Sequence, residues 1–239
     1  MNIDVYFTPL GLVSGDLIGR GVIVIDVLRA TTTIVTALAN GARAVVPAAT
    51  SEEAVRLTAN LERNGIVLAG ERRLVRIEGF GLGNSPREMT PAAVGGKTVF
   101  LATTNGTPAL VAVQGADPVL VAGAVNFSAA VERARAVFME RGHFALVCSG
   151  REKRFALEDA YAAGRFVRAL RKGNRRVALN DAAQVALDLA TKHRSWSEAF
   201  AASEAARMLQ EVDLGEDVTF AATADRYDVV PTYADRRIT

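Results

Sequence analysis

The sequence has very few of the residues on which several common kinds of site depend. Its 239 residues include one cysteine, Cys148, and two histidines, His143 and His193. A single cysteine forms no internal disulfide, which fits a reducing compartment, and the two histidines lack the spacing of zinc ligands. Aromatic residues make up only 6 % of the chain and do not alternate with basic ones, so no nucleic-acid partner is indicated.

Long apolar runs are also absent. No stretch approaches the roughly twenty residues that a membrane-spanning helix needs, and the N-terminus has no basic leader followed by an apolar segment. We therefore expect a cytoplasmic protein with no membrane partner. The formal net charge is only +2, and a local cluster of Arg151, Lys153 and Arg154 fits either a solvated face or an anion site.

The order of apolar segments indicates the fold class. Half of the residues are hydrophobic, which is enough for a globular core. Short β-branched runs alternate with alanine-rich amphipathic stretches over the first two thirds, which is typical of α/β proteins. We predict a largely parallel or mixed sheet covered by helices in three layers, followed by a helical C-terminal third. Residues 1–239 are expected to form a single domain, with a subdomain boundary near residue 173 as the alternative.

The predicted strands are short and rich in β-branched residues, and they cover residues 3–7, 22–26, 44–46, 66–69, 98–102, 119–122 and 144–148, with a short strand-like ending at 228–231. The predicted helices follow capping residues and cover residues 32–40, 51–64, 108–114, 126–141, 156–172, 181–191, 195–202 and 204–212. Residues 71–91 contain several glycines and prolines and are predicted to form a long loop, which is more often functional than not.

The first candidate site follows the apolar strand at residues 22–26. That strand leads directly to Asp26, Arg29 and Thr31. A carboxylate suits Mg²⁺ and a guanidinium matches phosphate or sulfonate geometry. The alternative is an ion pair beside a threonine helix cap. Because ligands of open α/β sheets gather beyond the carboxyl ends of strands, this position favours a site.

The second candidate site follows the strand at residues 98–102. Thr104, Asn105, Gly106 and Thr107 come at once after it, and Pro108 suits the first position of a helix. Backbone N–H groups at such a helix start bind anions, and the neighbouring hydroxyl and amide groups add donors. A plain capped turn has the same sequence features, so both interpretations stay open.

The third candidate site follows the strand at residues 144–148. Ser149 and Gly150 offer donors there, and Glu158 and Asp159 follow at the start of the next predicted helix. The two acids fit a metal site, but they also fit a purely structural interaction with the helix dipole.

Signatures of several hydrolase classes are missing. The chain has no Gly-x-Ser-x-Gly elbow, no Gly-x-x-x-x-Gly-Lys loop and no second acid two residues after Asp26. Cys148 and Arg154 have the Cys-x₅-Arg spacing of cysteine-dependent phosphatases. The positions of Gly150 and Phe155 do not suit that loop, so a buried structural cysteine is the favoured interpretation.

Several short motifs occur in a fixed order along most of the chain, at residues 24–31, 70–72, 78–80, 83–86, 103–107, 155–159, 179–183 and 230–231. Each motif is weak by itself, but their ordered set resembles the 2-phosphosulfolactate phosphatase family. The resemblance implies an Mg²⁺-dependent phosphatase that converts 2-phosphosulfolactate to 3-sulfolactate and phosphate, a reaction on the route to coenzyme M.

The resemblance also implies roles for individual residues. The catalytic set is Asp26, Arg29, Glu71 and Glu158. Metal ligands are expected among Asp26, Glu71, Glu158 and Asp159. The residues expected to bind phosphate and the other anionic groups are Arg29, Thr31, Arg72, Asn84, Ser85, Thr104, Asn105, Gly106, Thr107, Ser149 and Gly150. We expect water to attack the phosphate in line, without a covalent intermediate.

Gly81 departs from the family pattern, which resembles Gly-Phe-Asp at this point. If the missing acid has a role in the family, either Glu78 replaces it or the activity is altered. Two other functions therefore stay open: a phosphatase for another small phosphorylated hydroxy acid, and a non-catalytic anion-binding protein. Apolar helix faces in the last third leave a homodimer open as well.

Overall fold

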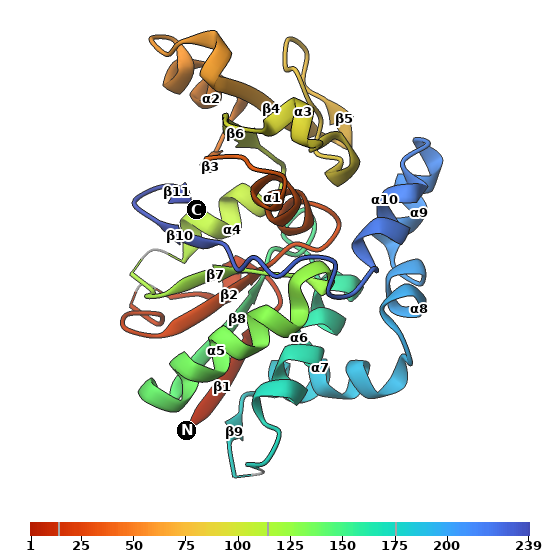
Figure 1. Ribbon diagram of the computed structural model, residues 1–239. Coiled ribbons are helices and arrows are strands. Elements are labelled where there is room, and N and C mark those ends of the chain that lie inside the picture. Colours follow the sequence, from red (N-terminus) through yellow and green to blue (C-terminus); the bar gives the residue numbers. More distant parts are fainter. Residues whose placement is uncertain (14, 114, 175) are drawn as a thin grey trace.

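A computed structural model describes residues 1–13, 15–113, 115–174 and 176–239 (Figure 1). Within these residues one sheet has the strand order β5-β4-β6-β3-β11-β10-β7-β2-β8-β1-β9. The strands are β1 (Asn2–Tyr6), β2 (Gly21–Ile25), β3 (Ala44–Ala48), β4 (Ile66–Arg72), β5 (Val75–Arg76), β6 (Thr98–Ala102), β7 (Val119–Val121), β8 (His143–Cys148), β9 (Ala178–Leu179), β10 (Thr232–Ala234) and β11 (Arg237–Ile238).

Helices connect most of these strands. The α-helices are α1 (Ala30–Ala39), α2 (Ser51–Thr58), α3 (Pro91–Val94), α4 (Gly106–Ala112), α5 (Phe127–Arg141), α6 (Leu157–Leu170), α7 (Asp181–Lys192), α8 (Trp196–Ala201), α9 (Glu204–Glu211) and α10 (Gly215–Ala221). Short 3-10 helices are η1 (Pro9–Gly11), η2 (Arg63–Gly65), η3 (Pro86–Glu88) and η4 (Ala124–Asn126).

The sheet consists of two parallel blocks joined by an antiparallel hairpin. The first block is β4, β6 and β3, and the second is β7, β2, β8, β1 and β9. The C-terminal hairpin β10–β11 lies between them, with Ile238 beside Val45 of β3 and Tyr233 beside Val119 of β7. The pairings β3–β11, β11–β10 and β10–β7 are all antiparallel, so the two blocks run in opposite directions.

Helices cover both faces of the second block. Every residue of β2 is buried. Ile23 and Ile25 pack in a core that also contains Phe138 of α5 and Phe166 of α6. The alternate positions of β2 pack in a second core with residues of α1 and α4. The predicted three-layer α/β fold with a mixed sheet and a helical C-terminal third is therefore confirmed, and Figure 1 shows α5, α6 and α7 grouped beside the second block.

Some predicted element boundaries are wrong. The helix predicted over residues 51–64 ends at Thr58, because the following residues are exposed and Leu61 has 46 % of its surface accessible. A helix without a packed apolar face is marginal in water. No strand forms at 228–231, and β10 begins only after Pro231, which lacks the N–H that a ladder requires. The helix predicted over 108–114 starts earlier, at Gly106, and Gln114 lies outside the described residues.

The loop predicted over residues 71–91 contains regular structure at both ends. β4 continues to Arg72 and forms a hairpin with β5, while η3 and the start of α3 lie near the other end. The hairpin turns through Arg73 and Leu74, with φ angles of 51° and 70°. Two residues with positive φ match a tight type I′ turn, but the sequence lacks the Asn-Gly pair that normally signals one.

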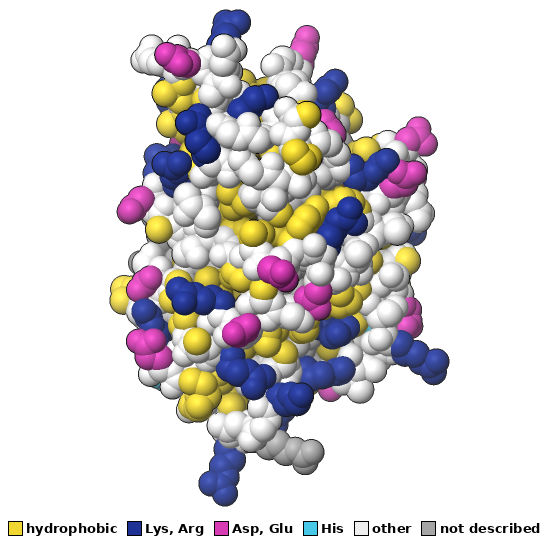
Figure 2. All heavy atoms as spheres, in the orientation of Figure 1, with side chains coloured by type: hydrophobic (Ala, Val, Ile, Leu, Met, Phe, Trp, Pro, Cys, Tyr) yellow, Lys and Arg dark blue, Asp and Glu magenta, His cyan; other side chains and the backbone are white. Residues whose placement is uncertain are grey.

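Charges are mixed over the surface. On the face in Figure 2, Lys and Arg side chains lie among Asp and Glu side chains rather than in one stripe, consistent with the net charge of +2. In the part of the chain that the structure describes, no helix has both the length and the apolar character to span a membrane.

Close packing of α6 on α7 depends on Gly164. A Cβ at this position would lie 1.8 Å from the carbonyl oxygen of Ala186. We expect Gly164→Ala to lower the free energy of unfolding by about 2 kcal/mol because the helices must separate, outweighing the gain of roughly 1 kcal/mol in helix propensity. Urea denaturation measures this, with Gly11→Ala as the control because its Cβ would make an ordinary contact at 3.6 Å. Equal stability of the two variants would contradict the prediction.

Candidate active site

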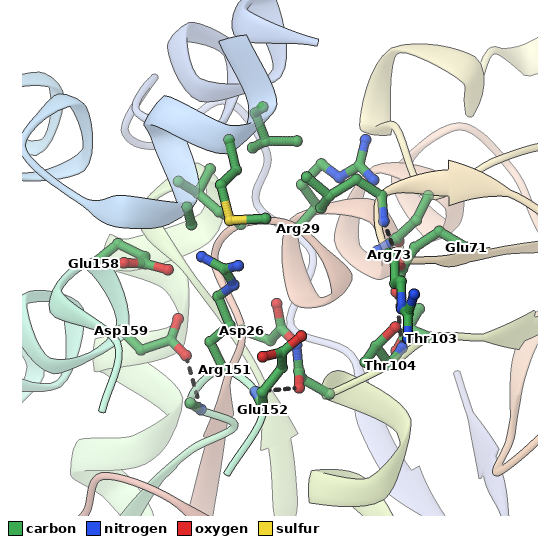
Figure 3. A pocket seen from close by; sticks show the side chains of 18 residues that line it. Asp26, Arg29, Glu71, Arg73, Thr103, Thr104, Arg151, Glu152, Glu158 and Asp159 are labelled. Atoms are coloured by element: carbon green, nitrogen blue, oxygen red, sulfur yellow. Dashed lines mark hydrogen bonds between the residues drawn. The ribbon is translucent and has the colours of Figure 1, made fainter. Parts of the chain in front are cut away.

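A pocket of about 160 Å³ lies where β2, β4, β6 and β8 end. β2 and β8 belong to one block of the sheet and β4 and β6 to the other, so both sets of carboxyl ends meet at this pocket. Figure 3 shows Asp26, Arg29, Glu71, Arg151 and Glu158 around the same space.

The end of β2 places the carboxyl group of Asp26 and the guanidinium group of Arg29 in the pocket. Asp26 Oδ1 accepts a hydrogen bond from the Ala30 N–H at 3.1 Å, and Thr31 Oγ1 donates to the Asp26 carbonyl oxygen at 2.9 Å. These bonds start α1 directly behind Asp26. A Cβ on Gly106 would lie only 2.8 Å from Asp26 Oδ2, so glycine is required for α4 to begin this close. Arg29 is 3 % exposed.

The end of β8 is fixed by Asp159. Its Oδ1 accepts from the Val27 N–H at 2.9 Å, while Oδ2 accepts from Ser149 Oγ at 3.1 Å and the Gly150 N–H at 3.3 Å. Asp159 therefore holds the exits of β2 and β8 together. Its neighbour Glu158 lines the same pocket and is 4 % exposed.

The other block contributes Glu71 and the turn after β6. Glu71 Oε1 accepts from the Thr104 N–H, and its Oε2 accepts from the Leu74 N–H, both at 2.8 Å. Asn105 Oδ1 accepts from the Glu152 N–H at 2.9 Å, which joins the exits of β6 and β8. These bonds link the two blocks around the pocket.

Burial disfavours the ionised forms of three acids at the site. Burial raises the pKa of Asp26 to about 6, and repulsion from Glu71 contributes. Burial likewise raises the pKa of Glu158 to about 7, with repulsion from Asp26 as a second cause. The pKa of Asp159 is well above its ordinary value because of burial and its two acidic neighbours. Clustered carboxyl groups with raised pKa values are typical of functional sites and would be relieved by a cation.

Several buried polar atoms of the pocket have no hydrogen-bond partner within the described residues. They are Nη2 of Arg29, Oγ1 of Thr104, Oδ1 of Asn84 and Nη1 of Arg151, the last of which lies 3.6 Å from Glu204 Oε1 in an ion pair. An unpaired buried polar atom costs about 1 to 3 kcal/mol. Two guanidinium groups and a hydroxyl are donors for an oxyanion, so their arrangement favours an anionic ligand.

Comparison with known proteins identifies the family. Residues 7–236 match the family model for 2-phosphosulpholactate phosphatase. The chain belongs to this family. A probable 2-phosphosulfolactate phosphatase of Caldanaerobacter subterraneus subsp. tengcongensis is 37 % identical over 97 % of this chain and 95 % of its own length. Relatives with the same description in Thermotoga maritima and Clostridium beijerinckii are 37 % and 30 % identical, covering 89 % and 100 % of this chain and 88 % and 99 % of their own lengths.

Most site residues predicted from the family resemblance line the pocket. They are Asp26, Arg29, Glu71, Asn84, Thr104, Asn105, Gly150, Glu158 and Asp159. They come from segments that are far apart in the sequence, and the strand ends bring them together.

Other predicted residues of the family site lie behind the pocket wall. Thr31 and Ser149 hold the ends of β2 and β8 through the hydrogen bonds described above. Thr107 shapes the turn after β6, because its Oγ1 donates to the Thr103 carbonyl oxygen at 3.0 Å, and Gly106 provides space beside Asp26. Ser85 Oγ donates to Asp217 at 2.6 Å. None of these five is among the residues that line the pocket.

The structure places the departure from the family pattern outside the pocket. Gly81 and Glu78 are exposed and do not line it. Arg72 is also exposed and outside the lining, whereas its neighbour Arg73 is part of the wall. Arg73 rather than Arg72 lines the pocket because the chain reverses direction in the tight turn at Arg73 and Leu74, at the edge of the pocket.

Several residues of the pocket have no sequence signal that indicates a role in the site. Arg73 and Arg151 line the pocket, as does an apolar wall of Leu28, Leu74, Met208 and Leu209. Arg151 stood in a basic cluster for which an anion site was one interpretation. Nothing in the sequence indicated that α9, from the helical last third, supplies part of the wall.

Two acids of the pocket, Asp26 and Glu158, could hold a magnesium ion. Among the described residues, no group of three or more His, Cys, Asp and Glu side chains is arranged to hold one metal ion. Both oxygens of Glu71 and of Asp159 already accept hydrogen bonds. Asp26 Oδ1 accepts from the Ala30 N–H, so Asp26 Oδ2 and the carboxylate of Glu158 are the oxygens that could hold a cation. Mg²⁺ usually takes only one or two carboxylates together with water and phosphate oxygens, so this donor set suits it.

Cys148 does not have the environment of a catalytic thiol. It is the last residue of β8 and is 1 % exposed. Burial, together with repulsion from Asp159 and Glu158, raises the pKa of its thiol well above the ordinary value. Since the thiolate is the nucleophilic form, the structural interpretation is favoured.

Replacement of this cysteine tests that interpretation. Cys148→Ser should leave phosphatase kcat/KM within about twofold of wild type, because the uncharged thiol performs no chemistry. The folded wild-type protein should also resist alkylation by iodoacetamide at pH 8, and urea should expose the thiol to it. Loss of turnover in a folded Cys148→Ser protein, together with rapid alkylation of the native thiol, would establish the cysteine mechanism instead.

Proposed function

We propose that this chain hydrolyses the phosphate ester of 2-phosphosulfolactate, releasing 3-sulfolactate and inorganic phosphate. The observation that carries this function is that Arg29 Nη2 and Thr104 Oγ1 lack hydrogen-bond partners in the pocket, where Arg151 forms only a long 3.6 Å ion pair with the exposed Glu204. A substrate with phosphate, carboxylate and sulfonate groups presents acceptors to all three. Family membership and relatives described as probable 2-phosphosulfolactate phosphatases support the same choice.

Substrate binding would rest on the basic and hydroxyl groups of the pocket. Arg29 and Arg151 would bind oxyanions through charge-assisted hydrogen bonds, and Thr104 would donate a further one. The apolar wall of Leu28, Met208 and Leu209 would restrict water around the ester. In such surroundings these interactions are stronger than in bulk water and stabilise the charge that develops on the transferring phosphoryl group.

Asp26 and Glu158 would hold Mg²⁺ in this proposal. The bound ion would neutralise phosphate charge and lower the pKa of a water molecule for attack on phosphorus. Asp159 would keep the exits of β2 and β8 at a fixed separation, since both of its oxygens bond to those segments. Positioning of this kind lowers the barrier by holding the reacting groups in alignment. A cytoplasmic location belongs to the same proposal.

Phosphate release from two esters tests the reaction. With Mg²⁺ present, purified protein should release phosphate from 2-phosphosulfolactate and much less from phospholactate, and EDTA should abolish the release. Asp26→Asn should lower kcat by at least about a hundredfold, because it removes a charged group from the reacting centre. Asp188→Asn, an exposed change on α7, is the matched control. A preference for phospholactate would assign another hydroxy acid, and tight phosphate binding without turnover would indicate a non-catalytic protein.

Thermal unfolding tests the metal site without a substrate. Mg²⁺ at a hundredfold excess over its Kd should stabilise the folded state by about 2.7 kcal/mol, because it removes repulsion between buried carboxylates. Glu158→Gln should lose most of this shift in melting temperature, while Asp188→Asn should keep it. An unchanged Mg²⁺ response in Glu158→Gln would remove that residue from the metal site.

A further inference from the structure

Asp217 is a buried acid in contact with the candidate active site. It lies in the first turn of α10 and is 0 % exposed. Its Oδ2 is 2.9 Å from Nη1 of Arg29, a residue 188 positions earlier in the chain. Because the side chains of both partners are almost inaccessible, at 2 % and 0 % exposure, water does not screen this ion pair.

The second oxygen of Asp217 is occupied by a different segment. Ser85 Oγ donates to Oδ1 at 2.6 Å, and the same Ser85 oxygen accepts from the Arg87 N–H at 3.3 Å. The adjacent Asn84 carbonyl oxygen accepts from Thr33 Oγ1 of α1 at 2.8 Å. Asp217 therefore fastens α10 to the segment before η3 and to the residue that precedes α1.

This arrangement leaves one terminal nitrogen of Arg29 unpaired. Nη1 is bound to Asp217, whereas Nη2 is buried without a hydrogen-bond partner in a residue that lines the pocket. A guanidinium is planar, so fixing one terminal nitrogen restricts the direction of the other. Without such a restraint a long arginine side chain samples many rotamers.

We infer that Asp217, with Ser85, is a positioning residue that holds Arg29 so that Nη2 meets an oxyanion of the bound substrate. Because that substrate belongs to the proposed phosphatase reaction, this role rests on the proposed function. Asp217 itself does not line the pocket. It acts through Arg29, and the helical last third of the chain thereby contributes to a site built on strand ends.

A purely electrostatic role of Asp217 and a positioning role predict opposite changes in anion binding when Asp217 is replaced. Asp217 is negatively charged, so its removal would by charge alone strengthen the binding of an anion. Loss of positioning would weaken binding, because Arg29 would no longer present Nη2 in a fixed direction. The sign of the change in phosphate affinity therefore separates the two effects.

Asp217→Asn is the primary variant, since asparagine preserves the shape and can still accept from Ser85. The control is Glu216→Gln, which changes the neighbouring residue on α10, an exposed acid paired with Arg87 at the surface. With Mg²⁺ present, calorimetry should show that Asp217→Asn weakens inorganic phosphate binding about tenfold and that Glu216→Gln leaves it unchanged. Equal or tighter phosphate binding by folded Asp217→Asn would overturn the inference.

The kcat/KM of a double variant gives a second test, which distinguishes positioning of Arg29 from a purely structural role of Asp217. Arg29→Met should lower kcat/KM, and adding Asp217→Asn to it should cause no further loss, because Asp217 acts only through Arg29. Additive losses would contradict this. If Asp217→Asn does not fold, Ser85→Ala replaces it, with an expected loss of about threefold in phosphate affinity, and unchanged affinity in that variant would overturn the inference.

These outcomes differ from those of a failed phosphatase proposal. If the wild type binds inorganic phosphate but turns over neither ester, the reaction is wrong, while phosphate binding by the variants still decides the role of Asp217. If the wild type binds no phosphate, both the function and the positioning role fail. Normal turnover by wild type with normal phosphate binding by Asp217→Asn removes the positioning role alone.

Discussion

The antiparallel hairpin of β10 and β11 is the constraint on which the site depends. It joins two parallel blocks that run in opposite directions, pairing with β3 on one side and β7 on the other. The carboxyl ends of β4 and β6 in one block and of β2 and β8 in the other meet at one pocket. Polar groups stand at the end of each of these strands, so the pocket collects Asp26, Glu71, Thr104 and Arg151.

Charge balance is the second organising feature. Three acids with raised pKa values, Asp26, Glu158 and Asp159, share a buried space with Arg29 and Arg151. Two backbone N–H groups and the Ser149 hydroxyl bond both oxygens of Asp159, while other polar atoms lack hydrogen-bond partners. Such an arrangement costs stability and is found mainly where a ligand completes it. The proposed anionic substrate and cation would complete this arrangement.

Secondary structure followed the sequence where packing and local pattern agreed. β2 is apolar throughout and flanked by polar residues, and both its position and its burial follow from that pattern. The end of α2 could not be predicted from the sequence, because nothing in residues 59–64 reveals that they lack a surface to pack against. The turn at Arg73 and Leu74 likewise depends on a hairpin that forces positive φ on residues that rarely adopt it.

The sequence alone determined the α/β class, the family, and the position of polar residues at the ends of strands, since all three depend on local order along the chain. Tertiary structure decided which of these residues share a pocket. It placed Arg73 rather than Arg72 in the pocket wall and brought Ser85 within hydrogen-bonding distance of Asp217. It also brought α9 and α10 next to the site at the end of β2. Contacts between residues far apart in sequence arise only when the strands assemble into the sheet and the helices pack on it, so no local pattern encodes them.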